Sequence, residues 1–254
     1  MTHEMVPARL NGKWDIILPK HRADRPEWAT GWEPERLDAL HNAIVGVYAE
    51  TALVNRRPVV YDIGTEEGDM TGLYSLWGAD VVAFEPNPLV WPNIRAIWQA
   101  NDLRPLAGHF VGFAAADTDE HPESIEPIIA APDIDGWPAC AHGPVIGDHG
   151  FRTIFERSGD TPRVRIDDYV QAHPDSPPDI ITMDVEGAEL EVLKGAEATL
   201  RNYRPVVFIS VHPEFMFAGF GQYEADLHGW LNARGYAGTH LAYDHEHHWE
   251  YHPS

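Results

Sequence analysis

Side chains that can bind ligands or exchange protons stand at the ends of predicted strands. Five short apolar runs end at Asp62, Glu85, Asp117, Asp184 with Glu186, and His212. In an open parallel sheet, ligands bind outside the carboxyl ends of the strands. Carboxylates there can accept hydrogen bonds from hydroxyls or bind divalent cations, and an imidazole can move a proton near neutral pH. These positions are therefore the first candidates for a functional site.

A glycine turn, "DIGTEEGD", follows the first run and begins at Asp62. Such a turn presents backbone N–H groups and a helix N-terminus, which favour an anion such as a pyrophosphate. Its acids, Glu66, Glu67 and Asp69, would oppose that anion, and the turn lacks the GxGxxG of a dinucleotide site. Either it is an ordinary surface turn, or its ligand carries hydroxyls and positive charge. S-Adenosylmethionine has a ribose, an ammonium and a sulfonium but no phosphate, so it fits the second interpretation.

Glu85 lies 23 residues after Asp62. This is about the distance at which an acid at the end of the second strand meets ribose hydroxyls. A carboxylate can hold both hydroxyls of a ribose at once. A nicotinamide dinucleotide would use such an acid too, so an NAD-dependent oxidoreductase is the alternative enzyme class. Asp62 itself is either part of the cofactor site or only a hydrogen-bonding residue at a strand end.

Alternating β-branched runs and helical stretches must position these residues. This alternation predicts βαβ units and a mostly parallel sheet in an α/β fold. We expect strands over 58–63, 80–85, 109–114, 179–184 and 205–211, and helices over 33–54, 68–77, 88–100 and 188–202. A short strand in "PRVRIDDYV" should lead into a turn, where Asp167 and Asp168 either cap the turn or line the substrate side.

The chain is predicted to form one main domain, residues 34–254, preceded by a helical arm over 1–33 that lies on it. An irregular connection over about 117–162 is dense in Pro, Gly and acids. A C-terminal hairpin over about 236–252 should close one sheet edge. Its histidines suggest either a metal site or, as we prefer, a polar edge hairpin; they are His245, His247, His248 and His252.

Composition excludes several classes of partner. The chain has 40 Asp plus Glu against 18 Lys plus Arg, a formal net charge of -22, so nucleic acid and anionic membranes are not expected partners. The acidity either solvates the surface or steers a cationic substrate. The single cysteine, Cys140, cannot form an internal disulfide. We expect a cytoplasmic protein with a small-molecule substrate, and a homodimer would be unsurprising.

Several motifs together resemble the FkbM-type family of S-adenosylmethionine-dependent methyltransferases. They are "VVYDIGTEEG", "VVAFEPNPLVWPNI", "RIDDYV" and, most specifically, "ITMDVEGAELEVLKGAEATLRNYRPVVFISVHPEF", and the resemblance covers about residues 58–215. It implies a class I Rossmann-like methyltransferase fold, with a seven-stranded sheet whose last hairpin strand is antiparallel. It also implies O-methylation of a hydroxyl, often on a sugar or a natural product.

The resemblance also implies roles for single residues. The matched positions are Asp62, Gly64 and Gly68 in the cofactor turn, Glu85, Pro86 and Asn87 in the ribose-binding stretch, Ala115 and Asp117 at the adenine edge, and Asp184 and Glu186 near the cofactor's methyl group. Two departures stand out. "TEE" replaces the family's usual small residue and Asn, and "ISVHP" lacks the acid that commonly precedes the His by two positions.

Methyl transfer to oxygen is an in-line displacement that requires an aligned and activated hydroxyl. His212 is the candidate general base, since its ordinary pKa of about 6.5 lies near neutral pH. Alternatively, Asp184, Glu186 and His212 hold Mg²⁺ or another divalent ion. Simpler roles stay open: His212 before a proline could shape a turn, and Glu186 could complement a helix dipole. A catalytically inactive methyltransferase-like binding module is a third functional hypothesis.

Overall fold

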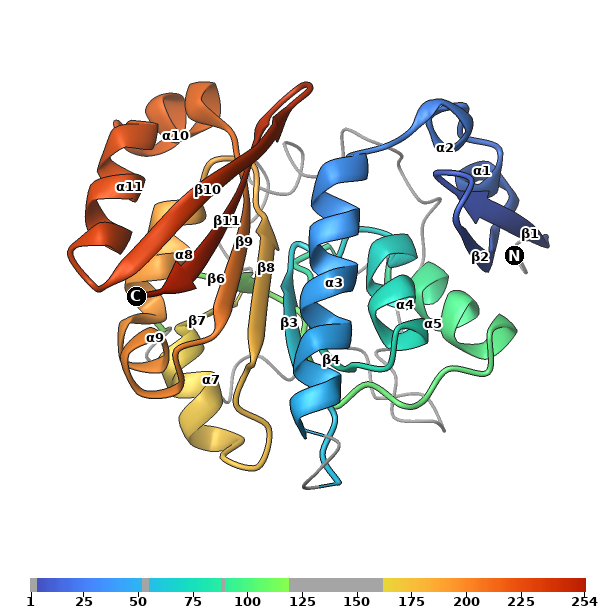
Figure 1. Cartoon of the computed structure of the whole chain (residues 1–254), viewed down its shortest axis with the longest axis horizontal. Helices are drawn as coiled ribbons and strands as arrows, with labels where there is room; N and C mark the ends of the chain where they lie inside the picture. Colours follow the sequence, from blue (N-terminus) through green and yellow to red (C-terminus); the bar gives the residue numbers. More distant parts are fainter. Residues whose placement is uncertain (1–3, 52–54, 88–89, 119–161) are drawn as a thin grey trace.

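A seven-stranded sheet forms the centre of the computed structural model, which describes residues 4–51, 55–87, 90–118 and 162–254 (Figure 1). The strand order is β10-β11-β9-β8-β3-β4-β5. The strands are β3 (Val59–Ile63), β4 (Asp80–Phe84), β5 (Gly108–Phe110), β8 (Ile180–Asp184), β9 (Val206–Val211), β10 (Tyr236–Tyr243) and β11 (His247–Pro253). Neighbours from β5 to β9 pair in parallel, whereas β11 runs antiparallel to β9 and β10. The predicted sheet, with its antiparallel last strand, is confirmed.

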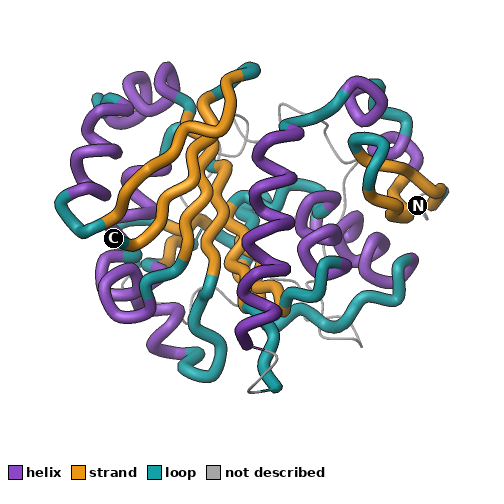
Figure 2. The backbone as a smooth tube through the Cα atoms, in the orientation of Figure 1, coloured by secondary structure: helices purple, strands orange, loops and turns teal. Residues whose placement is uncertain are grey.

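Both faces of the sheet are covered by helices (Figure 2). Val60, Ile180 and Phe208 pack toward α3 (Pro34–Thr51) and α4 (Asp69–Leu76). Alternate residues of the same strands, such as Tyr61 and Ile181, join the cluster on the opposite face. That face carries α7 (Ile166–Ala172), α8 (Glu189–Gly195), α9 (Glu197–Tyr203) and α11 (Glu224–Asn232). Burial on both faces explains why these strands are continuous apolar runs.

Three predicted elements differ from the structure. The strand expected over 109–114 is divided into β5 and β6 (Phe113–Ala114), and β6 pairs with β7 (Arg163–Val164). The helix expected over 188–202 is broken between α8 and α9 at Ala196, whose φ and ψ of -108° and 11° are not helical. Next to the break, a Cβ on Gly195 would lie 1.9 Å from the Ala115 carbonyl oxygen, so only glycine fits there. The turn expected after "RVRI" is the helix α7.

Asp167 explains how the chain begins α9 beside that break. Its carboxylate accepts hydrogen bonds from the backbone N–H groups of Ala198 and Thr199, at 2.9 and 2.7 Å. These are orphan donors in the first turn of a helix, which need such an acceptor. Asp167 is therefore a cap, as one of the two interpretations held, although it caps a helix distant in sequence and not its own turn.

The N-terminal segment is an ordered unit and not the helical arm that we expected. β1 (Met5–Leu10) and β2 (Trp14–Pro19) form an antiparallel hairpin, followed by the short helices α1 (Lys20–Ala23) and α2 (Glu27–Thr30). Figure 1 shows this segment in dark blue beside α5 (Trp91–Ala100), and Asn101 at the end of α5 exchanges two 2.8 Å hydrogen bonds with the backbone of Ile17. The segment covers the domain, as predicted, through strand pairing that its irregular sequence pattern did not reveal.

The remaining predictions for the chain concern its C-terminal half. The predicted hairpin is present as β10 and β11 at the sheet edge. Two helices there, α10 (Pro213–Phe220) and α11, were not predicted. Most of the expected irregular connection lies outside the described residues, and the domain boundaries stay a prediction. In the part of the chain that the structure describes, no helix is long and apolar enough to cross a membrane.

Candidate active site

The sheet places the predicted site residues at one edge. After β3 the chain continues outward through β4 and β5, whereas β8 and β9 lie on the other side of β3. The carboxyl ends of β3 and β8 therefore flank the point where strand order reverses, which is where open α/β sheets bind ligands. Asp62 and Gly64 lie at the end of β3, Asp184 ends β8 and His212 follows β9.

Gly64, just after β3, lies in close contact with the end of β8. Its φ is +88°, a conformation that disfavours side chains, and a Cβ there would lie 1.9 Å from the carbonyl oxygen of Asp184. Gly68, also at φ +88°, begins α4 against Ile94 of α5. We call residues 64–69 the cofactor turn. Only glycine allows this turn to lie so close to the end of β8.

Asp62 is buried beneath the cofactor turn. Its carboxylate accepts a very short hydrogen bond from the hydroxyl of Thr71 in α4. Burial raises the pKa of Asp62 to about 6, although the Thr71 hydrogen bond and the charge of Arg36 act in the opposite direction. These contacts show directly that Asp62 ties β3 to α4, and its cofactor role stays a prediction.

Glu85 faces the cofactor turn from the end of β4. Its two carboxylate oxygens accept backbone N–H hydrogen bonds from Glu66 at 2.8 Å and from Asn87 at 2.7 Å, across Pro86. Burial raises the pKa of Glu85 to about 8, although these two hydrogen bonds lower it. When it is ionised, the Glu85 carboxylate has about four acceptor sites, so two remain for a vicinal diol. This geometry is compatible with the ribose role that the spacing predicts.

The acids of the cofactor turn bind groups of the chain itself. Arg22 of α1 donates hydrogen bonds to Glu66 and Asp69, with a shortest distance of 2.8 Å to each. Glu67 is contacted by His21 at 2.6 Å, and the Asn93 amide donates to the same Glu67 oxygen at 2.7 Å. The sequence argument left these acids for a ligand's ammonium; the structure shows that they have partners in the chain itself, and the ammonium assignment stays a prediction. Arg22 was missed because 44 residues separate it from Glu66 and no local pattern connects them.

Ala115 and Asp117 belong to a different group of contacts. The Ala115 N–H donates to Val164 of β7 at 3.0 Å, and its carbonyl lies against Gly195 at the end of α8. The exposed Asp117 lies 3.5 Å from Arg163. The structure therefore places both residues with β7, and nothing in these contacts supports the adenine-edge role that the resemblance implies.

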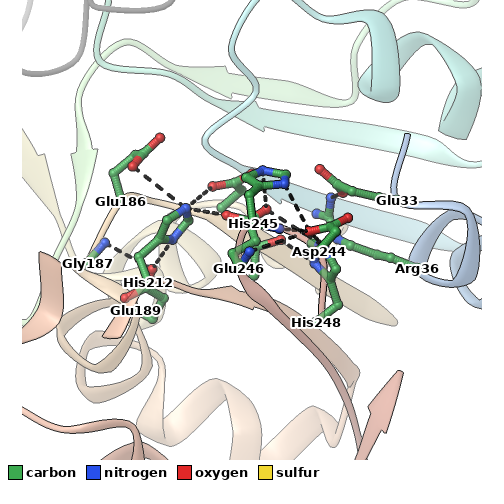
Figure 3. A network of polar contacts seen from close by, with 12 residues as sticks. Glu33, Arg36, Glu186, Gly187, Glu189, His212, Asp244, His245, Glu246 and His248 are labelled. Carbon is green, nitrogen blue, oxygen red and sulfur yellow. Dashed lines mark hydrogen bonds and ion pairs between the residues drawn. The ribbon is translucent and has the colours of Figure 1, made fainter. Parts of the chain in front are cut away.

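His212 lies among four carboxylates, and Figure 3 labels three of them, Glu186, Glu189 and Glu246, around its ring. Its Nδ1 is 2.9 Å from Oε1 of the fully buried Glu189. Its Nε2 is 3.6 Å from Asp184, 3.7 Å from Glu186, and in very short contact with Glu246. We call these five residues the His212 cluster. It brings together the three predicted catalytic residues and adds two that the sequence argument did not assign.

Four separate segments supply the carboxylates of the His212 cluster. Asp184 ends β8, Glu186 lies in the turn that follows, and Glu189 begins α8. The Glu189 oxygen that contacts His212 also accepts the Gly187 N–H at 3.0 Å, which fixes the carboxylate. Glu246 comes from the connection between β10 and β11, so the C-terminal hairpin completes the site.

The surrounding charge changes the protonation expected of His212. Burial alone would lower its pKa, but hydrogen bonds to Glu189 and Glu246 and the charge of Asp184 raise it to about 12. Burial and the charge of Glu246 likewise raise the pKa of Asp184 well above its ordinary value. An imidazolium has no lone pair with which to take a proton. These electrostatics oppose the predicted role of His212 as general base.

A divalent cation fits the same arrangement. Asp184, Glu186 and His212 each offer a ligand atom, and these atoms lie within 4.8 Å of one another. Glu189 at Nδ1 is the acidic partner that commonly orients a metal-binding histidine, and it directs Nε2 toward the other carboxylates of the cluster. The carboxylate oxygens are suitable ligands for Mg²⁺ or Mn²⁺, and the imidazole is a ligand typical of transition-metal ions. The residues present therefore fit the predicted metal.

A neighbouring group of similar spacing consists of Glu33, Glu246 and His248. A cation of the chain, the guanidinium of Arg36, already lies against its Glu33. Arg36 donates to Glu33 at 2.5 Å and to the Thr182 hydroxyl at 2.9 Å. The C-terminal histidines have separate partners. His248 is buried against Ser210, whereas the exposed His252 contacts Glu250. This supports the interpretation of a polar hairpin, although its Glu246 belongs to the His212 cluster.

Comparisons with known proteins agree with this geometry. The family model of the methyltransferase FkbM domain matches residues 62–237. A comparison with curated proteins gives no match.

Solved structures with a similar chain path come from several bacteria. The methyltransferase FkbM of Methylobacillus flagellatus KT has 17% identity and a TM-score of 0.47, over 85% of this chain and 58% of that chain. An S-adenosylmethionine-dependent methyltransferase from Agrobacterium tumefaciens has 10% identity and a TM-score of 0.47, over 100% and 72%. The precorrin-6y C5,15-methyltransferase of Geobacter metallireducens GS-15 has 12% identity and a TM-score of 0.44, over 91% and 94%. This chain thus spans little more than half of the first of these proteins.

The family model covers more than half of the sequence and includes every strand end discussed above. The chain therefore belongs to the methyltransferase FkbM domain family, whose members depend on S-adenosylmethionine.

Proposed function

We propose that this protein transfers the methyl group of S-adenosylmethionine to a hydroxyl of a small molecule, a sugar or a natural product. The observation that carries the proposal is the contact between Gly64 and Asp184, which joins the cofactor turn to the His212 cluster at the switch point of the sheet. A methyl donor held at the turn would thus lie beside groups that can act on an acceptor oxygen.

The residues around the cofactor turn would hold the methyl donor. Glu85 accepts hydrogen bonds from the ribose hydroxyls with its remaining acceptor sites, and Asn87 fixes one of its oxygens. Gly64 and Gly68 give the rest of the cofactor close access to the backbone, and Asp184 faces its tail. Arg22 already neutralises part of the negative charge of the turn.

The His212 cluster would orient and activate the acceptor. Asp184, Glu186, Glu246 and His212 are the groups that would hold a divalent cation, with Glu189 fixing the ring of His212. Such a cation, when bound, supplies Lewis-acid polarisation of a hydroxyl oxygen and lowers its pKa. In-line transfer then depends on the alignment that this rigid set of side chains provides.

Aromatic side chains beside the cluster support a ring-containing acceptor. Phe215 of α10 stacks on His212 with ring planes 14° apart and is partly exposed. Phe217 and Tyr223 nearby are exposed and contact each other. Aromatic faces of this kind bind sugars and planar rings.

The test is a calorimetric titration with S-adenosylmethionine, S-adenosylhomocysteine and NADH, followed by an acceptor screen. We expect micromolar binding of both adenosyl ligands, weakened roughly 100-fold but still measurable in Glu85→Ala, and turnover that stops with a chelator and returns with Mg²⁺. Binding of NADH alone would support an oxidoreductase instead. Adenosyl binding without turnover on any hydroxylated acceptor would support an inactive binding module.

A further inference from the structure

Arg22 lies between the N-terminal segment and the cofactor turn and is 4% exposed. Its Nη1 and Nη2 donate to the two carboxylate oxygens of Glu66, at 3.0 and 2.8 Å. Its Nε and Nη2 also donate to Asp69, at 3.1 and 2.8 Å. A guanidinium is planar and has five N–H donors, so one side chain can hold two carboxylates in a fixed geometry.

Glu66 connects Arg22 to the proposed ribose ligand. Its φ is +51°, which is uncommon for a residue with a side chain. In this conformation its N–H donates to Oε2 of Glu85 at 2.8 Å. A residue stays in such a conformation only where its surroundings hold it there. Arg22 holds the side chain of Glu66, and the backbone of Glu66 in turn holds Glu85.

The backbone of Arg22 is held in place by a contact within the N-terminal segment. The indole N–H of Trp28, a buried residue of α2, donates to the carbonyl oxygen of Arg22 at 2.8 Å. His21, next to Arg22, contacts Glu67 at 2.6 Å. The N-terminal segment thus contacts three acids of the cofactor turn from a packed position, which distinguishes it from an arm held by one surface ion pair.

We propose that Arg22 is a positioning residue for cofactor binding. It fixes Glu66 so that the Glu66 N–H orients the Glu85 carboxylate for the ribose hydroxyls of S-adenosylmethionine. The N-terminal segment, residues 4–33, is thereby a functional part of the cofactor site, although it lies outside the residues that the family model matches. The inference rests on the proposed role of Glu85 as the ribose ligand.

Two variants test this connection without removing the buried charge. Arg22→Ala would leave Asp69, which is 1% exposed, without its cation, and this risks unfolding. Glu66→Gln keeps the Arg22–Asp69 pair and weakens only the Arg22–Glu66 link. Arg22→Lys keeps the charge but not the fork that holds two carboxylates. The matched control is Lys13→Ala, which removes another contact between the segment and the domain, the 2.7 Å pair with Asp38.

The measurement is a double-mutant cycle on S-adenosylhomocysteine affinity, by calorimetry, with the melting temperature recorded for each variant. We expect Glu66→Gln and Arg22→Lys each to weaken binding roughly tenfold in the wild-type background and not at all in a Glu85→Ala background. Lys13→Ala should bind normally. A loss of equal size in both backgrounds, or no loss in either, would overturn the inference.

The cycle also separates this inference from the proposed function. If Glu85→Ala loses affinity and Glu66→Gln does not, the ribose role stands and the role of Arg22 is overturned. If Glu85→Ala binds as tightly as the wild type, the ribose role fails, and the inference fails with it.

Discussion

The two halves of the candidate site, the cofactor turn and the His212 cluster, differ in how their negative charge is balanced. At the cofactor turn, Arg22 lies against the acids and another side chain donates to Glu67. In the His212 cluster, four carboxylates surround one imidazole. Buried carboxylates without a partner are costly, so an excess of them marks a place where a proton or a cation must bind. The comparison supports the proposal that a cation binds in the second half, whereas the acids of the first half already have partners in the chain.

The largest predicted effect comes from a substitution at the contact between Gly64 and Asp184, which joins the two halves. Gly64→Ala should destabilise the protein by roughly 3–5 kcal/mol, since the added Cβ would collide with the Asp184 carbonyl and the φ of +88° strains any side chain. Urea unfolding measures this. The control is Gly46→Ala in α3, where nothing lies within 4 Å of the added Cβ, and this change should leave stability equal or raise it by about 1 kcal/mol.

A smaller effect is expected from a substitution of Glu189 in the His212 cluster. Glu189→Gln keeps the side-chain size but removes the charge that fixes the His212 ring, so it should lower metal affinity or kcat roughly 10- to 100-fold. S-Adenosylhomocysteine affinity should not change, because Glu189 lies in the other half. An equal loss of cofactor affinity would show that the two halves are not separable in this way.

A gradual effect concerns the pH dependence of the cofactor half. Burial raises the pKa of Glu85 from 4.5 to about 8, so the folded state binds the proton more tightly than the unfolded state does. Stability should therefore fall as pH rises between about 4.5 and 8, by at most about 1.4 kcal/mol per pH unit from this group. Glu85→Gln should flatten the curve of melting temperature against pH in that range. An unchanged curve would contradict the assigned burial effect.

Local sequence pattern was sufficient for the central sheet. The strands around Tyr61 and Ile181 are buried on both faces, so their β-branched runs are unambiguous. The pattern also placed Asp184 and His212 at adjacent strand ends, because neighbouring parallel strands share one edge. The N-terminal hairpin was missed, since its strands pair only with each other and lie on helices.

The parts of the site that escaped prediction depend on long-range contacts. Arg22 reaches Glu66 across 44 residues, and Glu246 reaches His212 from a hairpin that follows two unpredicted helices. Only the fold decides which acids a buried arginine meets. The same limit applies to the protonation of His212, because its raised pKa results from Glu189 and Glu246, which the sequence did not place beside it.

The most direct test of the difference between the halves is a Mn²⁺ titration followed by the electron paramagnetic resonance signal of free Mn²⁺. The account predicts one Mn²⁺ bound per chain, lost in Asp184→Asn and retained in Glu66→Gln. Absence of binding at millimolar Mn²⁺, or equal binding by Asp184→Asn and the wild type, would contradict the claim that the His212 cluster requires a cation.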